Sequence, residues 1–86
     1  MKVTFDEEAF SEYIEWQSED KKTLNRINAL IKSIQREGFM KGIGKPEVLK
    51  GNKGYSRRID ERNRLVYTGD SEQNIVIISC KGHYEE

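Results

Sequence analysis

The stretch KPEVLKGNKGYSRRIDERNRLVY, residues 45–67, decides the fold of this chain because it carries the signals for a β-meander. Two runs of β-forming residues, Tyr55–Ile59 and Asn63–Tyr67, flank Asp60-Glu61-Arg62, a pattern typical of a hairpin. A turn is expected just before them at Gly51–Gly54. The stretch therefore predicts antiparallel strands in the second half of the chain.

Two registers are open to this hairpin. A loop of three residues pairs Ile59 with Asn63 and Arg58 with Arg64, whereas a loop of two pairs Arg58 with Leu65 and separates the arginines. A slip of one residue turns every side chain to the other face of the sheet. We favour the first register because Ile59 needs a core, and Ile59 then shares one face of the hairpin with three other side chains: Arg57, Leu65 and Tyr67.

The chain before residue 39 predicts one strand and two helices. Met1–Phe5 alternates apolar and polar residues, which is typical of a strand with one buried face. Asp6 is expected to cap the first helix. The segment Ser18-Glu19-Asp20 is expected to close it and to cap the second helix, which ends at Gly38. The apolar positions are Ala9, Phe10, Tyr13 and Ile14 in the first helix, and Leu24, Ile27, Leu30, Ile31 and Ile34 in the second.

Ile75–Cys80 is a nearly continuous β-branched run, which predicts an interior strand. The element order is then β-α-α-β-β-β-β over a single domain, residues 1–86. We expect an α+β fold in which two N-terminal helices pack on a small antiparallel sheet.

The net charge of zero hides a separation of charges along the chain. The 86 residues hold 15 basic and 15 acidic side chains, but residues 41–64 alone hold eight basic and three acidic ones, a balance of +5. Such a patch can attract a polyanion, although an ordinary solvated surface is the alternative. The acidic N-terminus, the lack of a long apolar run and the single cysteine, Cys80, together lead us to expect a cytoplasmic protein.

One acid, Glu47, lies within this basic stretch, and the only histidine, His83, lies near the end of the chain. Cleavage of RNA by its own 2′-hydroxyl needs a base, a cation at the phosphate and an acid for the leaving oxygen. Glu47, an arginine pair formed by Arg58 and Arg64, and His83 would supply these roles without a metal or other cofactor if they converge. The alternatives are a solvated strand carboxylate, salt-bridged surface arginines and an exposed terminal histidine.

Four segments carry a specific resemblance: YIEWQSEDKKTLNRINALIK (13–32), GKPEVLK (44–50), YSRRIDERNRLVY (55–67) and CKGHY (80–84). Together they resemble the YoeB/Txe toxins of the RelE superfamily, along nearly the whole chain. The resemblance implies a RelE-like fold and a toxin of a type II toxin–antitoxin system that cleaves mRNA in the ribosomal A site and so inhibits translation. It also implies the ribosome, a small YefM/Axe-like antitoxin and a second toxin copy as partners.

The resemblance assigns roles to individual residues. Glu47, Arg64 and His83 match the family's catalytic base, transition-state cation and acid, while Arg58 and Tyr84 match substrate-binding residues. We add Lys50, in the same basic surface, as a substrate contact. Asn63 stands where relatives commonly have histidine. The alternatives for the whole chain are an inactive antitoxin-binding module and a topoisomerase-directed toxin on the same scaffold.

Overall fold

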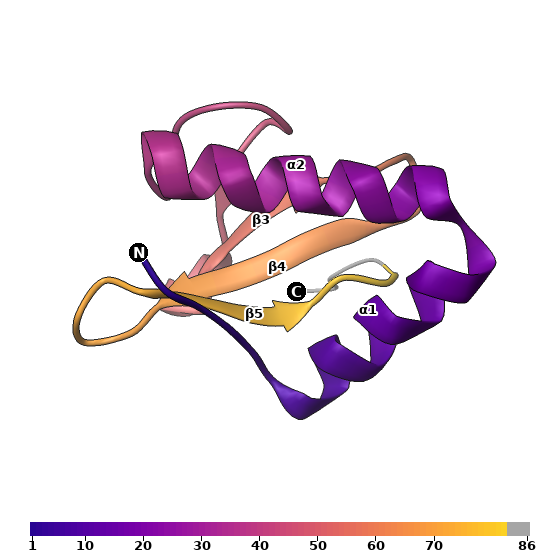
Figure 1. Ribbon diagram of the computed structural model, residues 1–86. Helices are drawn as coiled ribbons and strands as arrows, with labels where there is room; N and C mark the ends of the chain where they lie inside the picture. Colours follow the sequence, from indigo (N-terminus) through magenta and orange to yellow (C-terminus); the bar gives the residue numbers. More distant parts are fainter. Residues whose placement is uncertain (83–86) are drawn as a thin grey trace.

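The computed structural model describes residues 1–82 as two helices and a five-stranded sheet (Figure 1). In chain order the elements are β1 (Val3–Phe5), α1 (Glu7–Glu19), α2 (Lys21–Glu37), β2 (Glu47–Val48), a 3₁₀ turn (Lys50–Asn52), β3 (Tyr55–Arg58), β4 (Arg64–Gly69) and β5 (Ile75–Ser79). This is the element order expected from the sequence, and the α+β class is confirmed. No helix in this part of the chain has both the length and the apolar character needed to cross a membrane.

The strands lie in the order β1-β5-β4-β3-β2, so the sheet has β1 and β2 at its edges. The pairs from β2 to β5 are antiparallel, whereas β1 runs parallel to β5 with Val3 beside Ile75. The expected antiparallel sheet is therefore confirmed, with one parallel pair at the β1 edge. Parallel neighbours need a long crossover, which the two helices and the meander provide here.

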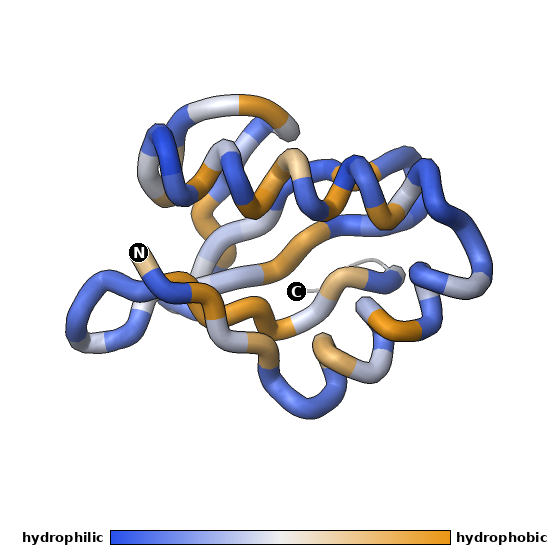
Figure 2. Tube along the Cα trace, in the orientation of Figure 1, coloured by the Kyte–Doolittle hydropathy of each residue, from blue (hydrophilic) through white to orange (hydrophobic). Residues whose placement is uncertain are grey.

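The hydrophobic core lies between the helices and the sheet. Figure 2 shows hydrophobic residues along the side of α2 that faces the strands, and hydrophilic residues along its outer side. The second helix contributes Ile27, Leu30 and Ile34, and the strands contribute residues that are also fully buried: Leu65, Tyr67, Ile75 and Ile77. Asp20 caps α2, because its carboxylate accepts hydrogen bonds from the Lys22 and Thr23 amides.

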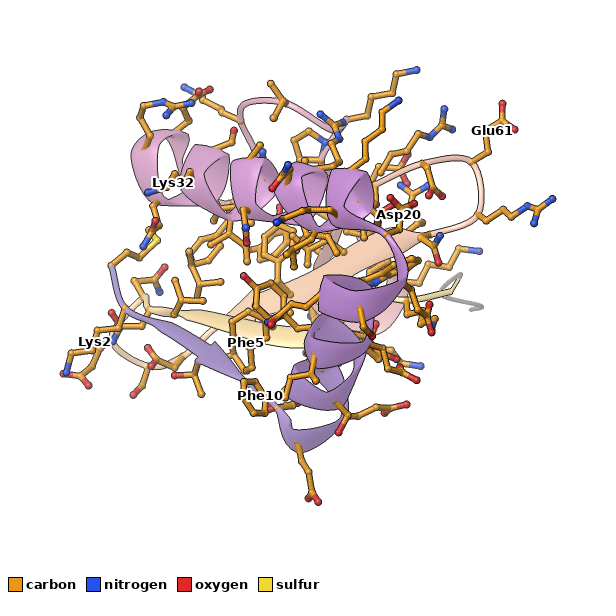
Figure 3. All side chains as sticks on the ribbon, turned by 45° about the vertical axis from the view of Figure 1, so that its right-hand side comes forward. Lys2, Phe5, Phe10, Asp20, Lys32 and Glu61 are labelled. Atoms are coloured by element: carbon orange, nitrogen blue, oxygen red, sulfur yellow. The ribbon has the colours of Figure 1, made fainter. Side chains whose placement is uncertain are left out.

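The first helix buries a different line of residues from the one its apolar positions indicated. Ala9 and Trp16 are buried, whereas Phe10 and Ile14 are about half exposed. Trp16 is drawn inward because its indole N–H donates to the Cys80 carbonyl at 2.9 Å. Phe10 lies at the edge of the core, with its ring 6.4 Å from that of Phe5 in an edge-on arrangement (Figure 3).

The hairpin adopts the favoured register. Arg58 pairs with Arg64, and the Ile59 amide donates to the Asn63 carbonyl across a three-residue loop. Asp60 shapes this loop, because one of its carboxylate oxygens accepts from the Arg62 and Asn63 amides at 2.8 and 2.7 Å. Partial burial alone would raise the pKa of Asp60, but these hydrogen bonds outweigh it and lower the pKa. Glu61, at the tip, points into solvent (Figure 3).

Candidate active site on the open face of the sheet

Strand pairing places the candidate residues on the face of the sheet away from the helices. Glu47 of β2 pairs with Ser56 of β3, and Arg58 of β3 pairs with Arg64 of β4. Directly paired residues point to the same face, and so do residues two apart along a strand. Because the alternating partner Leu65 faces the core, Glu47, Ser56, Arg58 and Arg64 share the open face.

Glu47 and Arg64 meet on this face. An Nη2 atom of Arg64 lies 3.5 Å from Oε2 of Glu47, and Nε of Arg64 donates to the Ser56 hydroxyl at 3.2 Å. The Arg64 side chain is only 19% exposed, whereas that of Glu47 is 64% exposed. The sheet therefore fixes the guanidinium and presents the carboxylate to solvent beside it. A fixed cation next to an accessible base is suited to acid–base chemistry on a phosphate ester.

The other predicted contacts flank this pair. Arg58 is exposed beside Arg64, and its backbone amide donates to the Gly44 carbonyl at 2.7 Å. Lys50 is exposed in the turn that follows β2. Arg58 therefore adds an exposed cation to the open face beside Arg64. His83 and Tyr84 lie outside the described residues.

Arg57 does not belong to the basic surface in which its sequence neighbours lie. It is fully buried on the helix side. Its guanidinium donates to the Tyr67 hydroxyl, the Ser33 hydroxyl and four backbone carbonyls, those of Gly38, Phe39, Lys41 and Ile43. Arg57 therefore fixes the loop that leads from α2 to Glu47. The hairpin register favoured from the sequence already placed Arg57 on the same face as Leu65 and Tyr67. That placement was the sequence signal that Arg57 is buried.

The loop held by Arg57 packs too closely for a side chain at Gly44. This residue has a φ of +88°, and a Cβ atom there would lie 2.6 Å from Cδ2 of Leu30. Glycine alone combines this backbone conformation with this contact. The close approach lets the loop run beside β3 and enter β2 at Glu47.

The C-terminal segment runs alongside Arg64. The Arg64 amide donates to the Gly82 carbonyl at 3.0 Å, and the Gly82 amide donates to Oδ1 of Asn63 at 2.7 Å. One residue earlier, the Lys81 ammonium lies 3.1 Å from a carboxylate oxygen of Glu19. The described chain therefore ends beside the Glu47–Arg64 pair, and His83 follows directly in the sequence.

Cys80 offers no nucleophile to this site. Its thiol is fully buried, and burial raises its pKa to about 12, with a further increase from the nearby Glu12 carboxylate. A thiol with such a pKa is almost entirely protonated at neutral pH. Within residues 1–82, no three His, Cys, Asp or Glu side chains gather as metal ligands would.

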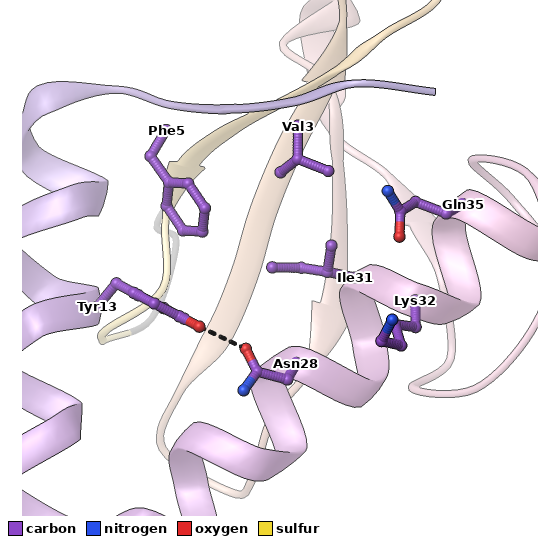
Figure 4. A pocket seen from close by; sticks show the side chains of 7 residues that line it. All are labelled: Val3, Phe5, Tyr13, Asn28, Ile31, Lys32 and Gln35. Atoms are coloured by element: carbon purple, nitrogen blue, oxygen red, sulfur yellow. Dashed lines mark hydrogen bonds between the residues drawn. The ribbon is translucent and has the colours of Figure 1, made fainter.

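A separate pocket of about 380 Å³ opens between β1, α1 and α2 (Figure 4). Val3, Phe5 and Ile31 give it an apolar wall, and the Tyr13 hydroxyl donates to Oδ1 of Asn28 at 2.6 Å on one side. Its lining contains one lysine and neither arginine nor carboxylate. The pocket therefore lacks the pairing of a carboxylate with an arginine that the open face has.

Comparison with known proteins identifies the family of this chain. Residues 5–84 match the family model described as the YoeB-like toxin of bacterial type II toxin–antitoxin systems. A protein named Toxin YoeB from Synechocystis sp. is 52% identical, with 99% of each chain aligned.

Two solved structures from Staphylococcus aureus have the same fold. A YoeB dimer is 51% identical, covers 98% of each chain and has a TM-score of 0.90. A heterotetrameric YoeB–YefM toxin–antitoxin complex is also 51% identical, with 98% of each chain covered and a TM-score of 0.87. The chain therefore belongs to the YoeB family of toxins of bacterial type II toxin–antitoxin systems.

Proposed function

We propose that this toxin is a metal-independent endoribonuclease that cleaves mRNA in the ribosomal A site and thereby stops translation. The observation that supports this proposal most directly is the contact between Glu47 and Arg64 on an open, cationic face. Family membership supports it further, because the residues of this contact lie in the GKPEVLK and YSRRIDERNRLVY segments that resemble the family motifs.

The reaction begins with the 2′-hydroxyl of the nucleotide before the scissile bond. Glu47 takes its proton, and the 2′-oxygen forms a bond to phosphorus. Arg64 stabilises the negative charge that builds up on the phosphoryl oxygens. The bond from phosphorus to the 5′-oxygen then breaks, and His83 protonates that oxygen. The products are a 2′,3′-cyclic phosphate and a free 5′-hydroxyl.

RNA binding must rearrange the Glu47–Arg64 pair. In the free protein Arg64 contacts the Glu47 carboxylate at 3.5 Å. A bound phosphate offers Arg64 a bidentate partner, and guanidinium–phosphate pairs are among the strong charge-assisted hydrogen bonds. The transfer of Arg64 to phosphate frees the carboxylate to accept the 2′-hydroxyl proton. Arg58 and Lys50 contribute phosphate contacts on either side, and Tyr84 stacks on a base.

A small YefM-like antitoxin and a second toxin copy are the expected protein partners. The Staphylococcus aureus structures show a YoeB–YefM complex and a YoeB dimer for a protein 51% identical to this chain. An antitoxin with acidic side chains would complement the cations of the open face. Bound there, it would compete with RNA for Arg58 and Arg64.

The test is cleavage of a defined mRNA on purified ribosomes, with the 5′ ends of the fragments mapped by primer extension. Glu47→Gln, Arg64→Ala and His83→Ala should each lower the cleavage rate about 10²- to 10⁴-fold. Glu61→Gln, at the exposed tip of the hairpin, is the matched control and should cleave at the parental rate. If all three site variants cleave as fast as the parent, the proposed roles are wrong. A parental protein that binds antitoxin but cleaves nothing would identify an inactive binding module.

A further inference from the structure

The side chain of Asn63 connects the hairpin to the C-terminal segment. Its Nδ2 donates to both carboxylate oxygens of Asp60 at 3.1 Å, and its Oδ1 accepts from the Gly82 amide at 2.7 Å. An amide has one donor group and one acceptor oxygen. Because Asp60 engages the donor group, the oxygen is turned toward Gly82.

We infer that Asn63 is a positioning residue, which sets the course of the chain immediately before the proton donor His83. This inference rests on the proposed function. Gly82 is held through both of its backbone groups, its N–H by Asn63 and its C=O by the Arg64 amide. Arg64 is also the proposed cation of the site. Asn63 and Arg64 therefore link the strand that carries this cation to the segment that leads to the proposed acid.

The first helix holds the same segment from its other side. The Cys80 amide donates to a Glu12 carboxylate oxygen at 2.7 Å, and the Cys80 carbonyl accepts from the Trp16 indole. These contacts, together with the ion pair between Lys81 and Glu19, hold the chain up to residue 81, but Gly82 is held by the hairpin. Gly82 has a φ of +88°. Glycine adopts positive and negative φ values about equally readily, so its own backbone preference does not select this conformation. Hydrogen bonds from outside the segment have to fix its amide.

The expected consequence is a loss of catalytic rate with little change in binding. An error of about 1 Å in the placement of a catalytic group can lower a rate about 10²-fold. Asn63→Ala should therefore lower kcat about 10- to 100-fold, while KM for mRNA-programmed ribosomes changes less than about threefold. Unfolding would expose Trp16 and change its fluorescence spectrum. Asn63→Ala should keep the spectrum of the parent, in which Trp16 is buried.

An exchange of the two side chains provides the conservative rescue. In the double variant Asp60→Asn/Asn63→Asp, the new amide at position 60 donates to the carboxylate at position 63, which still accepts from Gly82. Net charge and composition stay the same. This variant should recover kcat to within about threefold of the parent, because a hydrogen bond between the two side chains and the bond from the Gly82 amide can both form again.

A double-mutant cycle separates positioning from general stability. In a His83→Ala background, measured at single turnover with excess toxin, Asn63→Ala should change the rate less than about threefold, since no acid remains to be placed. The inference is overturned if Asn63→Ala keeps the parental kcat, if it slows both backgrounds equally, or if the exchange variant stays as slow as Asn63→Ala. If His83→Ala cleaves at the parental rate, the proposed function itself fails. If the His83→Ala rate is too low to measure, the exchange variant alone decides.

Discussion

Replacement of Arg57 by lysine tests the buried network that shapes the loop before Glu47. The Arg57 guanidinium is fully buried and contacts six oxygen atoms, four of them backbone carbonyls, at 2.6 to 3.4 Å. The salt bridges found within residues 1–82 do not include it. Its charge is therefore stabilised by oriented neutral groups, which only a planar side chain with several donors can reach together.

The expected cost follows from counting donors. Arginine has five N–H groups and lysine has three, so at least two of the hydrogen bonds are lost. Each buried polar group left without a partner costs about 1–3 kcal/mol, which gives a loss of about 2–6 kcal/mol for Arg57→Lys. A domain of 86 residues has a total unfolding free energy of about 4–13 kcal/mol, so this one change removes a large fraction of it.

The assay is urea denaturation followed by fluorescence of Trp16, the only tryptophan of the chain and a buried one. Arg58→Lys is the matched control, because Arg58 is the next residue in the same strand but its side chain is exposed. The control should change the free energy of unfolding by less than about 0.5 kcal/mol. If Arg57→Lys unfolds within about 0.5 kcal/mol of the parent, the network does not stabilise the loop and the reasoning from donor counts is refuted.

Two further predictions concern titratable groups. Burial raises the pKa of the Cys80 thiol from 9.0 to about 12, so its thiolate form is roughly a thousandfold scarcer at about pH 8. The folded protein should therefore resist a thiol reagent that reacts promptly with the protein in urea. Prompt reaction without urea would contradict the burial of Cys80. The hydrogen bonds from Thr23 lower the pKa of Asp20 below 3.8. The ionised Asp20 cap therefore stabilises the fold above about pH 4, and this stabilisation is lost as the pH falls through the pKa of Asp20 in the folded protein. Asp20→Asn keeps an acceptor that does not titrate, so its urea midpoint should fall less between about pH 5 and pH 2 than that of the parent; equal slopes would show that Asp20 does not contribute.

The parts of the fold that sequence predicted depend on local pattern. Alternation in the hairpin was enough to choose the register, because a slip would have exposed Ile59, and the correct register brought Arg58 opposite Arg64. The separation of Glu47 from Arg64 by one strand follows from the same pairing. The proximity of Glu47 to Arg64 was thus predictable once the strand order was known, although the distance between them was not.

The parts that sequence did not predict depend on contacts between distant segments. Trp16 is buried because it bonds the carbonyl of Cys80, 64 residues away, and no periodicity within α1 encodes that contact. Arg57 is the same residue type as its exposed neighbour Arg58. Its burial is possible only because oxygen atoms from the loop after α2 accept its hydrogen bonds. Tertiary partners override local preference in both cases.

The separation of charge along the chain has a structural meaning that the neutral total conceals. Three of the five acids of α1 contact the C-terminal segment: Glu15 and Glu19 pair with the Lys81 ammonium, and Glu12 accepts from the Cys80 amide. The Glu19 hydrogen bond raises the pKa of Lys81, so this lysine stays charged and bound to the helix. These three acids contact the C-terminal segment, whereas Arg64 on the open face contacts Glu47. A chain of zero net charge can in this way present the cations Arg58 and Arg64 on one face and still hold, by its own acids, the segment that leads to His83.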